Sequence, residues 1–118
     1  LSLGVPGSSD SSATSPEQVG RLPLSEAHLA SIRQSLLDGC MSYGGTAYSS
    51  LGSLAVPVAG KTGTAENPGS APHAWFAGYA PADDPVFAAA VVVEYGGQGS
   101  VVAAPMFRKL VETYLEPA

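Results

Sequence analysis

Two segments of the chain carry apolar residues at helical intervals. At the start of the first segment, Ser25 supplies a hydroxyl of the kind that caps helix N-termini, and Leu24 is expected to pack on Leu29 as a hydrophobic staple. The apolar positions of this segment are Leu29, Ile32, Leu36 and Leu37. The pattern predicts an amphipathic helix of about four turns that ends near residues 39–45.

The second helical segment lies at the end of the chain. Its apolar positions are Phe107, Leu110, Val111, Tyr114 and Leu115. Because proline is tolerated only in the first turn of a helix, Pro105 places the helix start near Ala103 or Ala104. A shorter helical turn is predicted from Thr46 to Leu54, with Thr46 as its N-cap.

Between these helices the pattern changes to short runs of β-branched, aromatic and small residues. Three runs, at residues 56–65, 75–79 and 86–94, predict strands that are separated by turn-forming residues. The short connections indicate an antiparallel meander packed against helices, an α+β fold. The third strand is almost entirely apolar, so both of its faces are expected to be covered, and part of the core is expected to lie outside this sequence.

Composition narrows the range of functions. The chain has 5 Lys and Arg against 10 Asp and Glu, so nucleic acid is not an expected partner, because there is no basic surface for phosphates. Because Cys40 is the single cysteine, an internal disulfide is excluded, and Cys40 is expected to be a small buried apolar residue. The only histidines of the sequence are His28 and His73, so no metal or cofactor site is predicted. The longest apolar run, Val86 to Val93, is too short to span a bilayer, so no membrane contact is expected from this chain itself.

The N-terminal segment has a composition of its own. From Gly4 to Pro16, eleven of thirteen residues are Gly, Pro, Ser, Thr or Asp, which cannot bury enough apolar surface to offset the entropy of ordering. We therefore expect residues 1–23 to be a flexible loop or linker and residues 24–118 to carry the fold. The chain begins at Leu1 without an initiator methionine or a signal segment, so it is expected to be a piece of a longer protein.

The segment Lys61-Thr62-Gly63-Thr64 combines residue types that suit one chemistry. On a strand, Lys61 and Gly63 share one face, whereas Thr62 and Thr64 share the other. An ammonium group, two hydroxyls and a backbone without a side chain together favour a carboxylate ligand. From these residues alone, the alternative is a solvated lysine beside a turn glycine.

The same segment resembles the Lys-Thr-Gly motif of the penicillin-binding proteins and serine β-lactamases. The resemblance extends over Pro57 to Glu66 and His73 to Pro81, which look like the third and fourth strands of the transpeptidase domain of class B penicillin-binding proteins. The stretch from Ala74 to Pro81 is most similar to the elongation, or rod-system, branch. The resemblance covers roughly Leu24 to Leu115, and it implies that residues 24–118 are the C-terminal part of such a domain.

The resemblance implies acyl transfer through a covalent serine ester, in the bacterial cell envelope on the outer side of the plasma membrane. Lys61 would set the positive potential of the cleft and keep the proton network of the nucleophile poised. Thr62 and Thr64 would bind the terminal carboxylate of a peptidoglycan stem peptide or of a β-lactam antibiotic, beside Gly63. The N–H of Thr64 would form half of the oxyanion hole, so Lys61 and Thr64 are the expected catalytic residues.

The sequence departs from this family at the nucleophile. The family carries Ser-x-x-Lys and Ser-x-Asn, but here neither Lys61 nor Lys109 follows a serine by three positions, and the only asparagine, Asn67, follows Ala65 by two. The serine is therefore expected on an N-terminal remainder of the same protein, present as a second chain, and this chain alone is expected to be inactive. A β-lactam sensor or serine β-lactamase relative, and a non-catalytic binding module of the same fold, remain open alternatives.

Other candidate residues have simpler explanations. His73 is interpreted as a loop histidine rather than a general base. Trp75 and Phe76 are expected to pack in the core, although either could border the substrate groove. Asp83-Asp84 is expected in a turn, and Gly96 to Gly99 is not interpreted as a phosphate site because it lacks the lysine of a P-loop.

Overall fold

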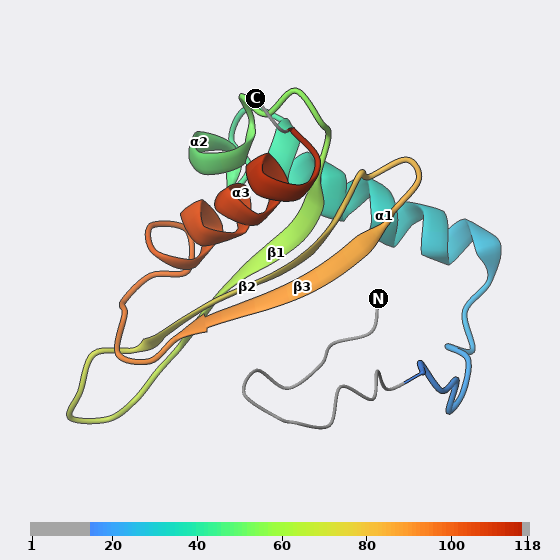
Figure 1. Cartoon of the computed structure of the whole chain (residues 1–118). Coiled ribbons are helices and arrows are strands. Elements are labelled where there is room, and N and C mark those ends of the chain that lie inside the picture. Colours follow the sequence, from blue (N-terminus) through green and yellow to red (C-terminus); the bar gives the residue numbers. More distant parts are fainter. Residues whose placement is uncertain (1–14, 117–118) are drawn as a thin grey trace, which may run out of the picture.

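The computed structural model describes residues 15–116, so residues 1–14 of the loop predicted at residues 1–23 lie outside the described part (Figure 1). Residues 15–25 form neither helix nor strand and are exposed. The elements that follow are α1 (Glu26–Met41), α2 (Tyr48–Leu51), β1 (Ala59–Ala65), β2 (His73–Ala80), β3 (Phe87–Val93) and α3 (Ala103–Tyr114).

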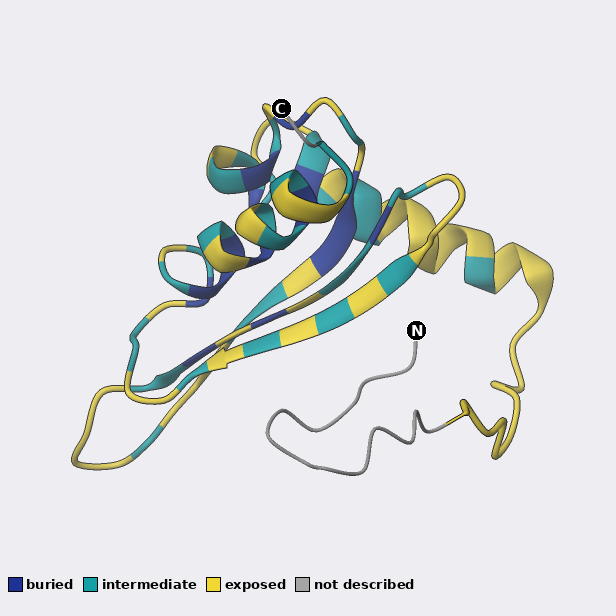
Figure 2. Ribbon diagram, viewed as in Figure 1, coloured by how far each residue is buried: buried dark blue, intermediate teal, exposed yellow. Residues whose placement is uncertain are grey.

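Helix α1 is anchored to the rest of the chain at its C-terminal end. Ser25 Oγ accepts a hydrogen bond from the His28 backbone N–H at 3.2 Å, which confirms the predicted cap. Most of the helix is exposed (Figure 2). Ile32 keeps 46% of its surface in solvent. Cys40, in the last turn, is fully buried, as predicted. The N-terminal half of α1 is therefore largely without a partner among the described residues.

The short helix α2 contacts both α1 and α3. Its N-cap is Ala47, so the prediction that Thr46 caps this helix is wrong. The Ala47 N–H donates to the Gly39 carbonyl at 3.0 Å and fixes the start of α2 against the end of α1. The Thr46 hydroxyl instead lies 3.2 Å from the Thr62 hydroxyl in β1.

The three strands form one antiparallel sheet in the order β1, β2, β3, which confirms the predicted meander. Across the sheet, Thr62 pairs with Phe76, and Phe76 pairs with Val91. Residues paired in this way share one face, so the side chain of Thr62 lies on the same face as that of Phe76.

Two strand boundaries differ from the prediction. β1 begins at Ala59 and not near residue 56, because the Pro57 carbonyl accepts its hydrogen bond from the Ala82 N–H at 2.8 Å, outside the β1–β2 register. β2 begins earlier than predicted, because His73 pairs with Ala65. The interpretation of His73 as a loop residue is therefore wrong.

The core lies between one face of the sheet and helix α3. Phe76 and Phe107 are fully buried, with their ring centroids 4.7 Å apart. The helix approaches closely at Gly78, where a Cβ would lie 3.2 Å from the Phe107 ring. Pro105 is in the first turn of α3, and the helix begins at Ala103, as predicted.

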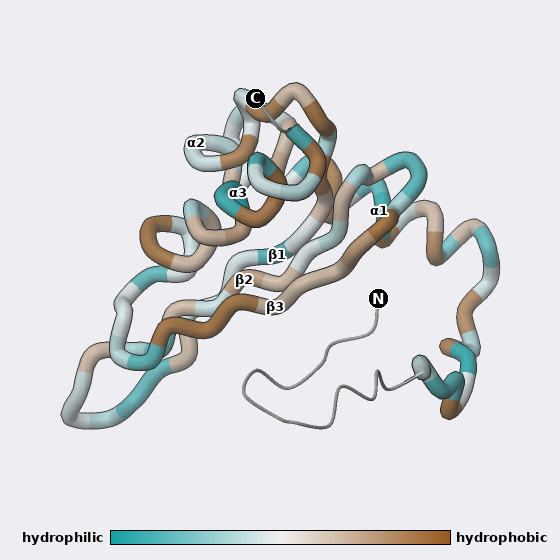
Figure 3. Tube along the Cα trace, viewed as in Figure 1, coloured by the Kyte–Doolittle hydropathy of each residue, from teal (hydrophilic) through white to brown (hydrophobic). Residues whose placement is uncertain are grey.

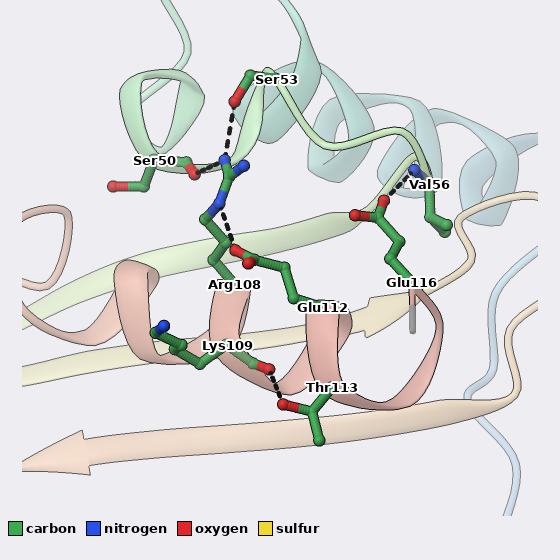
Figure 4. Close-up of polar contacts among 8 residues, drawn as sticks. All are labelled: Ser50, Ser53, Val56, Arg108, Lys109, Glu112, Thr113 and Glu116. Carbon is green, nitrogen blue, oxygen red and sulfur yellow. Dashed lines mark hydrogen bonds and ion pairs between the residues drawn. The ribbon is translucent and has the colours of Figure 1, made fainter. Parts of the chain in front are cut away.

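Arg108 joins α3 to the α2 region. Its guanidinium donates to the Ser50 carbonyl and to Ser53 Oγ, both at 2.8 Å, and its Nε donates to Glu112 Oε1 at 2.6 Å (Figure 4). One side chain therefore joins α3 both to α2 and to the segment that follows it.

The opposite face of the sheet is uncovered over much of β2 and β3 (Figure 2). Its exposed residues are Trp75, Ala77, Ala88, Ala90 and Val92. The prediction that both faces of the third strand are covered is wrong for residues 15–116, because α3 packs on β2 and β3 from one face while α1 packs mainly against β1. β3 is nevertheless largely apolar along its length (Figure 3).

No helix in the described part of the chain has both the length and the hydrophobicity needed to cross a bilayer. Within residues 15–116, no three or more His, Cys, Asp or Glu side chains are grouped so that they could hold a metal ion.

Candidate active-site strand

Strand β1 forms one edge of the sheet, and its backbone groups alternate between β2 and this free edge. The Gly60 carbonyl accepts a hydrogen bond from Cys40 Sγ at 3.7 Å, and the Thr62 carbonyl accepts one from Lys61 Nζ at 2.9 Å. Both carbonyls therefore point away from β2. Because alternate residues of a strand direct their N–H and C=O groups to the same side, the N–H of Thr64 also points to the free edge.

The Lys61 side chain is exposed and lies along this edge. Besides the contact with the Thr62 carbonyl, its Nζ lies 3.5 Å from Thr62 Oγ1, so the ammonium group reaches around the edge toward the face that carries the threonines. Lys61 forms no ion pair with any residue in the described range. The salt bridge found there joins Arg108 and Glu112 and does not involve Lys61. Its positive charge is therefore available to an anionic ligand.

The two threonine hydroxyls each contact a residue from outside the strand. Thr62 Oγ1 donates to Thr46 Oγ1 at 3.2 Å, and Thr64 Oγ1 accepts a hydrogen bond from the Gly99 N–H at 3.3 Å. Neither Thr46 nor Gly99 was singled out for this role by the sequence. In the sequence, Thr46 precedes a short helix and Gly99 ends a glycine run that precedes a longer helix. These patterns predict local structure and do not indicate which strand the two residues contact.

Glycines allow close approach on both sides of this contact. A Cβ at Gly63 would lie 3.2 Å from the Trp75 Cβ. Gly99 is buried, and a Cβ there would overlap the carbonyl oxygens of Gly63 and Trp75, which are paired in the β1–β2 ladder. The loop at residues 96–99 therefore packs directly on the ladder, and the Gly99 amide is used to bind Thr64 and not an external anion.

Other candidate residues have structural roles. His73 Nδ1 accepts a hydrogen bond from the Tyr95 N–H at 2.9 Å, which ties the start of β2 to the loop after β3. Phe76 is buried as expected, whereas Trp75 is 42% exposed, so the packing prediction is wrong for Trp75 because its face of the sheet is uncovered. Asp83-Asp84 lies in the exposed connection between β2 and β3, in agreement with the predicted turn.

Cys40 supports β1 from the buried side. Its thiol contacts the carbonyl of Gly60, the residue that precedes Lys61. Burial raises the pKa of this thiol to about 11. A neutral, buried thiol is a packing residue and not a nucleophile.

Comparison with known proteins assigns this arrangement to a family. Residues 5–112 match the family model of the penicillin binding protein transpeptidase domain. The chain belongs to this family. The structure is similar to that of PBP2 from Pseudomonas aeruginosa, with a TM-score of 0.72 and 35% identity over 86% of this chain and 22% of that chain. It is also similar to PBP2 from Helicobacter pylori, with a TM-score of 0.62 and 31% identity over 79% of this chain and 18% of that chain.

Two curated relatives carry the name peptidoglycan D,D-transpeptidase. PbpA from Mycolicibacterium smegmatis is 44% identical over 69 residues, which are 51% of this chain and 14% of PbpA. MrdA from Haemophilus influenzae is 49% identical over 43 residues, which are 36% of this chain and 7% of MrdA. This penicillin-binding protein chain thus spans a small part of its relatives, and the matches identify it as a C-terminal part of a class B transpeptidase domain.

Proposed function

We propose that this chain supplies the Lys-Thr-Gly strand of a peptidoglycan D,D-transpeptidase whose nucleophilic serine lies outside these 118 residues. The observation that carries the proposal is the free edge of β1. There, the consecutive residues Lys61 to Thr64 carry an ammonium group, two threonine hydroxyls and an outward N–H group. The ammonium group has no ion-pair partner among the described residues. Family membership supports transpeptidation as the reaction class, and the proposed chemistry is acyl transfer through a serine ester.

A ligand with a terminal carboxylate fits this edge. The Lys61 ammonium group supplies the charge, and the hydroxyls of Thr62 and Thr64 are donors of the kind that bind carboxylate oxygens. Gly63 leaves space for the ligand backbone to run beside the strand as an added strand would. The stem peptides of peptidoglycan end in such a carboxylate, and β-lactam antibiotics carry an equivalent one.

The outward N–H of Thr64 suits one half of an oxyanion hole. A backbone donor fixed by the sheet stabilises the negative charge that develops on the carbonyl oxygen under attack, and it does not need to reorganise during the reaction. The Gly99 contact to the Thr64 side chain adds a second point of attachment at this residue.

Open apolar surfaces support completion by another segment. A groove of about 590 Å³ lies between β3 and the end of α3, lined by Val86, Phe87, Ala88, Ala89, Ala90, Leu110, Tyr114 and Leu115. The uncovered sheet face and the exposed side of α1 add to this surface. Exposed apolar surface that is contiguous in this way is typical of interaction sites. We assign it to the N-terminal remainder of the same protein, as a second chain that carries Ser-x-x-Lys, so that this chain alone is inactive.

The test uses the two lysines of the chain in the full-length protein that contains it. Labelling with a fluorescent penicillin is measured for the Lys61→Ala and Lys109→Ala variants. Because hydrogen bonds from a charged group are strong, Lys61→Ala is expected to slow acylation by about tenfold to a hundredfold. Lys109 is exposed on α3, so its variant serves as the matched control and is expected to label at the wild-type rate. Equal rates in the two variants would remove Lys61 from the mechanism.

The lifetime of the label distinguishes the alternatives. A transpeptidase keeps the penicilloyl group for a long time, whereas a serine β-lactamase relative releases it by hydrolysis, and a non-catalytic module takes up no label. The proposed location is the bacterial cell envelope, on the outer side of the plasma membrane, where peptidoglycan is assembled. The rod-system role is proposed from the resemblance of Ala74 to Pro81 to that branch.

A further inference from the structure

Thr46 is held rigidly although its side chain is exposed. The preceding Gly45 packs so closely on the last turn of α1 that a Cβ there would lie 2.5 Å from the Gly39 carbonyl oxygen. The Gly45 N–H donates to the Ser42 carbonyl at 2.9 Å, and the next residue, Ala47, is 1% exposed and donates to Gly39. The Thr46 hydroxyl is therefore presented from a fixed backbone.

Among residues 15–116, this hydroxyl meets one partner, the Thr62 hydroxyl of the candidate strand, at 3.2 Å. Lys61 Nζ lies 3.5 Å from the same Thr62 oxygen and has no acceptor role, because an ammonium group only donates. Three polar groups thus form a short chain from Lys61 through Thr62 to Thr46.

The number of protons in this series of three polar groups limits the hydrogen bonds that the Thr62 hydroxyl can donate. A hydroxyl has one proton, so a Thr62 that donates to Thr46 cannot at the same time donate to a carboxylate. If the bond between the two hydroxyls reverses, Thr46 donates to Thr62 and the Thr62 proton is released for the ligand. A hydroxyl that accepts a hydrogen bond is also polarised into a better donor.

We propose that Thr46 is a positioning residue, which donates to Thr62 and directs the Thr62 proton to the carboxylate of the bound ligand. This inference rests on the proposed function, because it concerns the same carboxylate site. Thr46 itself touches no reacting atom in this scheme and acts through Thr62.

The test measures the second-order rate of acylation by a fluorescent penicillin in the full-length protein that contains this chain. Thr46→Val keeps the shape of the side chain and removes the hydroxyl, and Thr46→Ala is a second removal in case the valine variant does not fold. Both are expected to slow acylation by about threefold to tenfold, the effect of one neutral hydrogen bond, whereas Thr46→Ser should stay within about twofold of the wild type. Thr113→Val removes a hydroxyl that donates to the Lys109 backbone carbonyl within α3, and it is the matched control, with no expected change.

A double-mutant cycle with Thr62→Val distinguishes positioning from a general structural role. If Thr46 acts through Thr62, Thr46→Val has no further effect on the acylation rate once Thr62 is valine. Additive losses, a Thr46→Ser variant as slow as Thr46→Val, or removal variants that acylate at the wild-type rate would each overturn the inference. Failure of the wild-type protein to take up penicillin at all would instead refute the proposed function.

Discussion

Substitution of Gly99 by alanine tests the contact between the glycine loop and the candidate strand. The added Cβ would overlap the carbonyl oxygens of Gly63 and Trp75 and would lie 3.0 Å from the Gly63 nitrogen. All of these atoms belong to one backbone pair of the β1–β2 ladder, which cannot move without disrupting the ladder. The loop must therefore shift away from β1.

The cost can be estimated from the two effects of this shift. Overpacking of a well-packed site costs about 1–3 kcal/mol, and loss of the hydrogen bond from the Gly99 N–H to Thr64 adds about 1 kcal/mol. We therefore expect the free energy of unfolding to fall by about 2–4 kcal/mol, and acylation by penicillin to slow because Thr64 loses a point of attachment.

The assay is urea unfolding of the purified protein, with penicillin labelling of the same samples. Gly20→Ala is the matched control, because Gly20 is exposed, lies outside the helices and strands, and has no atom within 4 Å of the position of an added Cβ. If Gly99→Ala unfolds at the same urea concentration as the Gly20→Ala control, the packing of this loop on the ladder is refuted.

Two other predictions concern the supports of the site. Arg108→Ala should lower the free energy of unfolding, measured in urea, by about 1–2 kcal/mol; the value is modest because the Arg108–Glu112 pair is partly exposed to solvent. Arg33→Ala, at an exposed position on α1, should leave the free energy of unfolding unchanged. Equal urea midpoints for the two variants would contradict the role of Arg108. Cys40 should resist iodoacetamide at pH 8 until the protein unfolds. Burial raises the pKa of the Cys40 thiol from 9.0 to about 11, so the thiol loses its proton at a lower pH in the unfolded chain than in the folded one. The contribution of Cys40 to stability is therefore complete below pH 9 and is lost as the pH approaches 11. Rapid alkylation of the native protein at pH 8 would contradict the burial of this thiol.

The order and type of the elements followed from local patterns in the sequence. The spacing of apolar residues located α1 and α3, Ser25 marked the start of α1, and Pro105 marked the start of α3, because each of these signals acts within a few residues of the chain. The strand meander followed from the short turn-forming connections.

The contacts that shape the candidate site could not be predicted in this way. Thr46 bonds to a residue 16 positions away, and Gly99 bonds to Thr64 across 35 positions, so neither contact leaves a periodic signal. Thr46 matched the local pattern of a helix cap, but tertiary contacts at Ala47 set the start of α2 instead. The apolar sequence of β3 indicated that a cover is needed and that part of the core lies outside this sequence, but not which face of the strand is left exposed within residues 15–116.

The most direct test of the central claim is to locate the penicilloyl group by peptide mass mapping after the full-length protein is labelled. We predict that the group is attached to a serine of a Ser-x-x-Lys sequence outside these 118 residues, and that Lys61→Ala reduces the amount attached within a fixed time. Attachment to a residue of this chain, or no attachment to any serine, would contradict the assignment of β1 to one side of a shared acyl-transfer site.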